Sequence, residues 1–363
     1  MKNKVLTGLL LVLIGGWGSL SAQSAGSNYS RQVNTLIGTK GVGLTSGYLY
    51  PGATYPYGMV QFTPSYFSKR SGFVINQLSG GGCEHMGNFP TFPVKGKLKM
   101  SPDNILNYRI NISEEKGHAG YYEAMVQEDI KAKLTVTERT GMASYEYPAD
   151  QQYGTVIIGG GISATPIEQA AIVITAPNKC EGYAEGGNFC GLRTPYKVYF
   201  VAEFDTDALE SGTWKRNELK PNTTFAEGEY SGVYFTFDVD KKKNVQYKIG
   251  VSYVSVENAR ENLKAENTGW DFLQIQNQAE SKWNHYLGKI EVEGTNPDRT
   301  TQFYTHLYRS FIHPNVCSDV NGEYMGADFK VHKSRSKHYT SFSNWDTYRT
   351  QIQLLSILDP EVV

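Results

Sequence analysis

The chain up to residue 256 is dominated by short stretches of β-branched and aromatic residues, and several of them alternate with polar positions. They lie at residues 135–147, 155–158, 198–204, 233–239 and 245–256. A period of two is typical of strands that bury one face, and Ser-Gly and Gly-Gly pairs separate the stretches as turns do. Because no helical pattern intervenes, residues 30–256 are predicted to form an antiparallel β-sandwich.

The pattern changes at Glu257, where apolar residues begin to recur at steps of three and four. This spacing predicts a connector of one or two helices over residues 257–290, with Gly269 as the break if there are two. Further helices are predicted over residues 298–312 and from Asn344 onward. A few amphipathic helices cannot bury their apolar faces alone, so they are expected to pack on the sandwich or to continue into further chain.

The N-terminus has the features of a secretory signal peptide. Lys2 and Lys4 precede a largely apolar run over residues 5–14, and small residues lead to a cleavage position after Ala22. The alternative is a transmembrane anchor, but a spanning helix needs about twenty apolar residues and this run is about half that length. We therefore expect residues 1–22 to be a signal peptide and the protein to be exported without a membrane span. The periplasm, the outer surface and the medium stay open.

Composition narrows the class of partner. The formal net charge is −1 and 20% of the residues are charged, so no basic excess indicates binding to nucleic acid. There are 25 tyrosines and 37 glycines. Tyrosine in this number suits β-structure, and it also suits sugar-binding surfaces, where a ring packs on C–H groups and its hydroxyl forms hydrogen bonds.

The four cysteines are Cys83, Cys180, Cys190 and Cys317. Cys180 and Cys190 bracket a glycine-rich stretch, and in an oxidising compartment a local disulfide between them is expected. The sequence has no CxxC pair and no Cys/His set with zinc-site spacing.

Three segments have a composition that regular structure does not require. Residues 37–64 contain six glycines and three prolines among aromatic residues, which indicates a shaped loop, either structural or functional. Residues 78–94 contain three successive glycines followed by Cys83, Glu84 and His85. A thiol nucleophile with its base is one interpretation, but adjacent residues on a strand point to opposite faces. We favour a position at the rim of a pocket.

The third segment, residues 339–349, reads YTSFSNWDTYR. Ser343 or Asn344 can cap the helix that follows, and Asp346 in its first turn is favoured by the helix dipole. The functional alternative is that Trp345 and Asp346 hold a sugar ring, because an indole face can stack on the ring while a carboxylate accepts hydrogen bonds from two hydroxyls.

These three segments, in this order, resemble glycoside hydrolase family 92, whose members are mostly exported bacterial exo-acting α-mannosidases. The likeness runs through residues 33–39, 50–64, 78–93, 307–328 and 339–349. It implies a mixed fold with an N-terminal β-sandwich over residues 30–256, a helical linker over 257–290, and an (α/α)6 barrel that begins at 291. It also implies release of terminal α-linked mannose with inversion, with the help of Ca²⁺.

Family members are about twice as long as this chain. Inversion needs a general acid and a general base, with their carboxyl groups roughly 6.5–9.5 Å apart. The resemblance places both of them, and the calcium ligands, in later parts of the barrel for which this chain has no matching segment. Residues 291–363 are therefore expected to be the first part of a truncated barrel. The chain is expected to lack catalytic residues and to be inactive alone.

The residues that the resemblance assigns to substrate binding are few. Trp345 and Asp346 match a block that helps to form the pocket for the terminal mannose, with Arg349 in support. Cys83, Glu84 and His85 match the part of the pocket wall that comes from the sandwich. The expected partner is a mannose-containing glycan such as an N-glycan or mannan. The glycosidic linkage that is cleaved and the oligomeric state stay open. The alternative function is that of a non-catalytic carbohydrate-binding sandwich.

Overall fold

The computed structural model describes residues 28–40, 47–65, 72–102, 111–340 and 344–363. The predicted signal peptide therefore lies outside the described residues, as do residues 41–46 of the first glycine-rich segment. Within the described ranges, no helix is both long enough and apolar enough to cross a bilayer.

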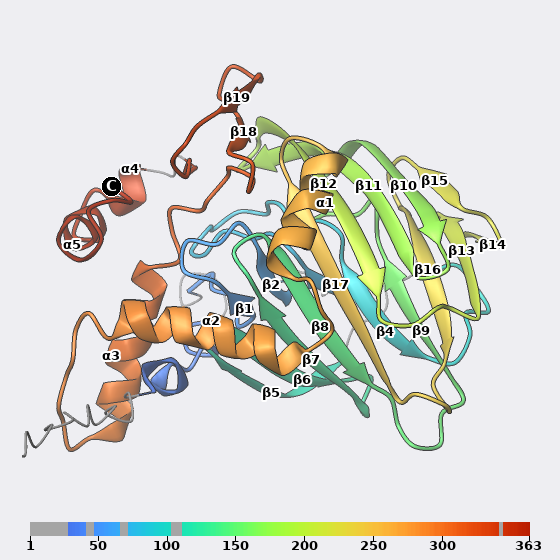
Figure 1. Ribbon diagram of the computed structural model, residues 1–363, viewed down its shortest axis with the longest axis horizontal. Helices are drawn as coiled ribbons and strands as arrows, with labels where there is room; N and C mark the ends of the chain where they lie inside the picture. Colours follow the sequence, from blue (N-terminus) through green and yellow to red (C-terminus); the bar gives the residue numbers. More distant parts are fainter. Residues whose placement is uncertain (1–27, 41–46, 66–71, 103–110, 341–343) are drawn as a thin grey trace, which may run out of the picture.

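Two large antiparallel sheets pack face to face as a β-sandwich (Figure 1). Within the described residues, the eight-stranded sheet has the order β1 (Ala53–Thr54), β2 (Gln61–Pro64), β3 (Phe73–Val74), β4 (Thr91–Lys95), β9 (Tyr153–Ile158), β16 (Ser231–Asp238), β13 (Glu210–Lys215), β14 (Glu218–Pro221). The nine-stranded sheet, described in the same ranges, has the order β15 (Phe225–Glu227), β10 (Ile167–Ala176), β11 (Lys179–Phe189), β12 (Leu192–Phe204), β17 (Asn244–Ser252), β8 (Thr140–Glu146), β7 (Ile130–Val136), β6 (Tyr121–Val126), β5 (Ile112–His118). The predicted antiparallel sandwich is confirmed.

Aromatic side chains join the two sheets. Phe204 of β12 lies with its ring centre 4.9 Å from that of Phe235 and 5.0 Å from that of Phe237, which both come from β16 in the opposite sheet. All three side chains are buried. Tilted ring pairs of this kind contribute about 0.5–1.5 kcal/mol each beyond the burial of apolar area.

One predicted strand is wrong in its extent. Residues 135–147 form the end of β7, a turn and then β8, because Thr137 and Thr140 close the chain on itself. Their side-chain oxygens lie 2.7 Å apart, and the Thr137 N–H donates to the carbonyl oxygen of Thr140. Apolar residues on both sides of this turn hid it from the alternation pattern.

The helices follow the sandwich in the chain. They are α1 (Val256–Glu266), α2 (Phe272–Leu287), α3 (Pro297–Ser310), α4 (Asn344–Thr347) and α5 (Gln351–Leu358), with a short 3-10 helix η1 (Tyr29–Gln32) near the N-terminus and a small hairpin of β18 (Glu323–Met325) and β19 (Val331–Lys333). The connector is thus two helices with Gly269 between them. Ser255, Asp271 and Asn296 cap α1, α2 and α3 by accepting backbone N–H bonds. The last predicted helix is interrupted, since Thr350 has φ of 65°.

Helix α1 lies against β17 and β12 on the outer face of the nine-stranded sheet (Figure 1). The approach is close at Gly250 of β17. A Cβ built there would lie 2.6 Å from the carbonyl oxygen of Ala259 and 2.7 Å from the Cβ of Leu263. Glycine at this position therefore sets the distance between helix and sheet.

A second hydrophobic core forms where α2 and α3 meet the N-terminal segments of the chain. Its buried members are Val33, Tyr57, Ala119, Trp283, Leu287, Tyr304, Leu307, Tyr308, Phe311, Ile312 and Leu355. Trp283 is fully buried and its Nε1–H donates to the carbonyl oxygen of Thr54 at 2.7 Å. Arg309 of α3 donates to the carbonyl oxygens of Thr35 and Tyr50. Residues 50–54 of the first glycine-rich segment are thus held against the helices.

The close approach at Gly250 gives a stability test. Gly250→Ala should lower the free energy of unfolding by about 1–3 kcal/mol, because the added methyl group forces α1 away from β17. Gly294→Ala is the matched control, since the nearest atom to its added Cβ would be Thr300 Oγ1 at 3.7 Å. Urea unfolding measures both. An unchanged midpoint for Gly250→Ala would contradict the packing described here.

Candidate functional site

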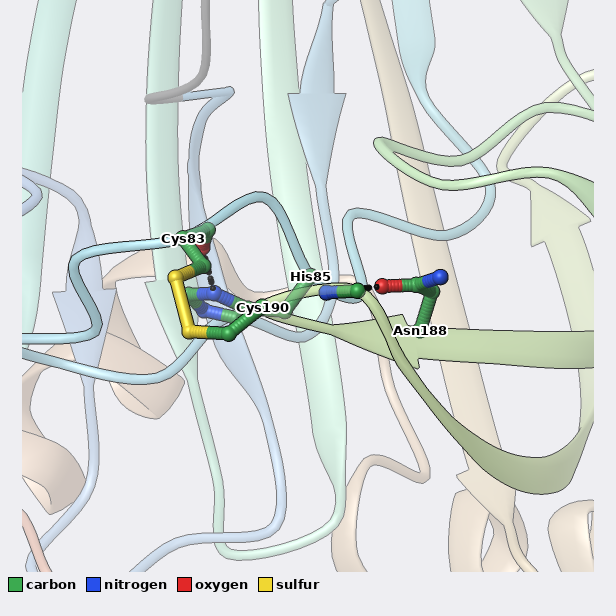
Figure 2. Close-up of a disulfide and its surroundings, with 5 residues drawn as sticks. Cys83, His85, Asn188 and Cys190 are labelled. Carbon is green, nitrogen blue, oxygen red and sulfur yellow. Dashed lines mark hydrogen bonds between the residues drawn. A yellow bond between two sulfur atoms is a disulfide. The ribbon is translucent and has the colours of Figure 1, made fainter.

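The glycine-rich loop of residues 78–85 is fastened to the sandwich by a disulfide between Cys83 and Cys190 (Figure 2). The predicted Cys180–Cys190 bridge is wrong. Both residues border one extended strand, β11, so ten residues of rise separate them by roughly 30 Å, whereas bridged Cα atoms lie at most about 7 Å apart. Cys180 is a buried free thiol whose pKa burial raises. Cys83 is bonded, so it is not a free nucleophile.

The side chain of His85 holds the same loop in place through hydrogen bonds to the loop backbone. Its ring is buried, and the Leu78 N–H donates to Nε2 at 2.8 Å. Nδ1 therefore carries the proton and donates to the Cys83 carbonyl oxygen at 2.6 Å. Burial lowers the pKa of His85, so the imidazole is neutral. His85 shapes the loop through both ring nitrogens, while Glu84 beside it is exposed to solvent.

A second neutral histidine ties the loop to the helical part of the chain. The Ser79 N–H donates to Nε2 of His313 at 3.1 Å, so Nδ1–H of His313 donates to Asn315 Oδ1 at 2.9 Å. Burial lowers the pKa of His313 to about 4. We call His85, His313 and Asn315 the histidine node. It connects a loop of the eight-stranded sheet with the segment that follows α3.

Asn315 extends this connection to the first glycine-rich segment. Its side-chain amide donates to the carbonyl oxygens of Gly58 and Ile312, both at 2.9 Å. The neighbouring Tyr57 donates from its N–H to the Phe311 carbonyl oxygen and accepts from the Val316 N–H. Segments that are more than 250 residues apart in the chain therefore pair as closely as adjacent strands.

Four aromatic rings gather at this pairing, and we call them the aromatic box: Tyr57, Tyr286, Phe311 and Tyr339. The ring of Tyr57 meets the other three edge to face, with centres 5.5–6.2 Å apart. Burial, with the negative charge of Asp359, raises the pKa of Tyr57 well above its usual value. Burial, with Glu138 and Asp359, raises the pKa of Tyr339 to about 12. These phenols stay protonated and can donate hydrogen bonds.

Two carboxylates border the aromatic box. Glu138 accepts from Arg139 Nη1 at 2.6 Å and is also paired with Lys337. Asp359 follows α5 and lies 3.8 Å from Lys289 Nζ. Protonated phenols beside carboxylates place hydrogen-bond donors and acceptors side by side. Tyr57 and Phe311 are buried, whereas Tyr286 and Tyr339 at the edge of the aromatic box are partly accessible.

An open groove of about 760 Å³ runs along the exposed face of α2. Its lining is mostly amide and other polar side chains, from Tyr55, Gln274, Asn277, Gln278, Lys282 and His285. Burial, with the charges of Glu138 and Glu266, raises the pKa of Tyr55 to about 12. The groove thus presents mainly hydrogen-bonding side chains to solvent, with Asp271 and Lys282 among them.

The residues predicted for sugar binding on the helical side lie on and after α4. Trp345 is 81% exposed, and the guanidinium of Arg349 lies 5.3 Å from the ring centre of Tyr348. The side chain of Asp346 lies outside the described structure. The connection from this segment to Glu84 and His85 that the structure describes is indirect. It passes through Asn315, whose carbonyl oxygen accepts from the Thr340 N–H.

The described residues do not bring together three His, Cys, Asp or Glu side chains that could hold a metal ion. The Ca²⁺ that the resemblance implies has no such ligand set in this part of the chain.

Several residues of the site were missed by sequence reasoning. Tyr57 and Tyr339 lie inside segments that were singled out, although not as site residues. Glu138, His313 and Asp359 gave no local signal, because each is positioned by contacts with distant segments.

Comparison with known proteins identifies the family of folds. The family model of the glycosyl hydrolase family 92 N-terminal domain matches residues 32–252, and that of the family 92 catalytic domain matches residues 258–363. An uncharacterized secreted glycosidase of Arthroderma benhamiae is 26% identical, over 88% of this chain and 45% of that protein.

Solved structures of family GH92 enzymes are similar in fold to this chain. A family GH92 α-mannosidase of Bacteroides thetaiotaomicron in complex with mannoimidazole has a TM-score of 0.81 at 26% identity, over 91% of this chain and 46% of that one. A family GH92 inverting mannosidase of the same species has a TM-score of 0.79 at 25% identity, over 92% and 46%. The chain spans about half the length of the relatives it matches.

The disulfide should contribute strongly to stability, because it closes a loop of 107 residues. Removing it with Cys83→Ser/Cys190→Ser should lower the free energy of unfolding by about 2–5 kcal/mol. Cys317→Ser is the control for loss of an unbonded thiol. Non-reducing peptide mapping should recover the Cys83 and Cys190 peptides joined, and a Cys180–Cys190 linkage would refute the assignment.

The histidine node predicts a loss of stability in acid. The pKa of His313 is near 4 in the folded state and about 6.5 in the unfolded state, so the unfolded chain binds the proton more readily between these values. Its contribution is present above pH 6.5 and is lost as the pH falls toward 4, by at most about 3 kcal/mol. His313→Gln, which keeps an acceptor for Ser79, should flatten this part of the stability curve. His306→Gln, an exposed change on α3, serves as control. If the free energy of unfolding falls equally steeply with decreasing pH in wild type and in His313→Gln, this role of His313 is excluded.

Proposed function

The chain belongs to glycosyl hydrolase family 92, and from this premise we propose that it forms part of an exported exo-acting α-mannosidase. The reaction removes terminal α-linked mannose from glycans with inversion at the anomeric carbon. The observation that carries the proposal is the likeness, over most of the chain, to an α-mannosidase whose structure contains mannoimidazole.

We assign the parts of the chain as follows. The sandwich of residues 30–256 supplies one wall of the substrate pocket through the loop of residues 78–85. The linker of residues 257–290 joins it to the opening helices of a catalytic barrel at residues 291–363. The disulfide and the histidine node support this division, because they fix the wall before any sugar binds, so less ordering is required on binding.

On the helical side, Trp345 stacks on the pyranose ring of the terminal mannose. Its 81% exposure leaves a ring face open to a ligand. Asp346 accepts hydrogen bonds from two neighbouring hydroxyls of the sugar, and Arg349 supports this segment. Stacking on C–H groups together with a bidentate acceptor favours a pyranose of defined hydroxyl orientation.

The general acid, the general base and the ligands of Ca²⁺ are proposed to belong to the part of the family's length that this chain does not cover. An inverting pair needs room for a water molecule between its carboxyl groups. The residues described here would bind and orient the terminal sugar. They would leave bond cleavage to carboxylates supplied elsewhere.

Mannoimidazole binding tests the assignment of Trp345. Trp345→Ala should weaken the affinity by up to about tenfold, because a stacking contact on an aromatic face is worth roughly 0.5–1.5 kcal/mol. Phe225→Ala removes an exposed aromatic side chain from β15 of the sandwich and should leave the affinity unchanged. Calorimetric titration measures both variants, and equal affinities would remove Trp345 from the pocket.

The enzymatic part of the proposal has a separate test. Gene sequence beyond the codon for Val363 should encode further helices that carry a pair of acidic residues. A stop codon at that position, with mannoside binding intact and no release of mannose, would instead favour a non-catalytic carbohydrate-binding module.

A further inference from the structure

The small hairpin of β18 and β19 lies at the edge of the sandwich beside α1 and away from α2 and α3 (Figure 1), and the side-chain amide of Asn258 in α1 donates to Glu323 Oε2 at 3.1 Å. We use the name basic hairpin for residues 323–338, which comprise the two strands, their turn and the segment that follows. Neither the fold nor the proposed mannose pocket explains its composition.

Positive charge is concentrated there. Residues 323–338 contain four Lys or Arg and two His, against one Glu and one Asp, in a chain whose net charge is −1. Lys330 and Arg335 are both exposed, and neither forms an ion pair among the described residues. The ion pairs that Lys333 and His332 form in the hairpin are either long or exposed to solvent. Lys333 Nζ lies 3.8 Å from Glu323, and His332 Nε2 lies 2.9 Å from Asp328.

Flat ring faces accompany the charge. The ring of Tyr324 stacks on His338, with centres 3.8 Å apart and planes 18° from parallel, and on His332 at 5.6 Å and 28°. Phe329 at the turn is 68% exposed. Rings of this kind, interleaved with cations, can contact the C–H faces of sugars while the cations hold anionic substituents.

The basic hairpin leads directly into the candidate site. The Cys317 N–H donates to the His338 carbonyl oxygen, Val316 pairs with Tyr339, and Lys337 pairs with Glu138. Tyr339 is a member of the aromatic box. A glycan chain whose terminal sugar occupies the pocket can therefore continue across the basic hairpin.

We propose that the basic hairpin binds anionic groups on a glycan, such as sulfate, phosphate or carboxylate, at sugars remote from the terminal mannose. Its place relative to the substrate rests on the proposed function, whereas the affinity for a polyanion does not. Continuity with the aromatic box and the stacked rings favour a glycan over a membrane surface. Asp328 at the turn also opposes contact with an anionic bilayer.

Dextran sulfate and neutral dextran of equal size are the probes, because neither contains mannose. Wild type should bind dextran sulfate and not dextran, with an affinity that falls steeply as salt is added. Lys330→Gln/Arg335→Gln should weaken this binding about tenfold. The matched control is Lys241→Gln/Lys242→Gln, which removes two lysines at the turn between β16 and β17 that are paired with Asp238 and Asp205. It should change the affinity less than about twofold.

Equal losses in the two double variants would overturn the proposal, because binding would then follow net charge alone. So would tight binding to phosphatidylglycerol vesicles that depends on Phe329 when dextran sulfate binding does not. Mannoimidazole affinity should be the same in Lys330→Gln/Arg335→Gln as in wild type. If the wild-type chain binds dextran sulfate but does not bind mannoimidazole, that result would count against the mannosidase proposal alone.

Discussion

The main-chain pairing of Tyr57 with Phe311 and Val316 is the contact on which the arrangement of the site depends. It joins a loop of the sandwich to the segment after α3, and Asn315 reinforces it by donating to the Gly58 carbonyl oxygen. Backbone groups buried at such a junction must be paired, because each unmade hydrogen bond there costs about 1–3 kcal/mol. The junction therefore permits little sliding between sandwich and helices, and the residues around it keep their relative positions.

Two kinds of link act on the loop of residues 78–85. The Cys83–Cys190 disulfide attaches it to the end of β11, and His313 attaches it to the helical segment. The first link acts mainly by restricting the unfolded chain, while the second depends on a neutral imidazole and weakens in acid. The same loop is thus secured by one link that is indifferent to mild acid and by one that is not.

Much of the fold could be predicted from local pattern. Alternation indicated the sandwich, and the change of period at Glu257 marked the start of α1 to within a residue. The resemblance predicted from three segments is confirmed at the level of the family. The disulfide was wrong for a physical reason, since sequence proximity of Cys180 and Cys190 says nothing of distance once the residues between them form an extended strand.

The site was less predictable than the fold, because its chemistry comes from pairs of distant residues. Tyr57 contacts Tyr286 and Tyr339, and its pKa is raised by burial and by Asp359, which lies some 300 residues further along the chain. No local motif encodes a contact of that range, and only the folded junction brings these groups together. Sequence can indicate which segments are shaped for function, whereas the protonation state of each group is set by burial and by neighbours that the fold supplies.

The two sides of the proposed pocket differ in how firmly their residues are held in place. The loop of residues 78–85 on the sandwich side is disulfide-linked and hydrogen-bonded through the buried His85, whereas Trp345 and Tyr348 on the helical side are 81% and 53% exposed. A sugar held by one open indole face gains only part of the available stacking and dispersion energy, because the opposite ring face stays in water. In the proposed pocket, strong binding of a terminal mannose would therefore require a second surface over Trp345. Under the proposed function, the preorganised loop of residues 78–85 would serve as the fixed reference against which that surface positions the sugar.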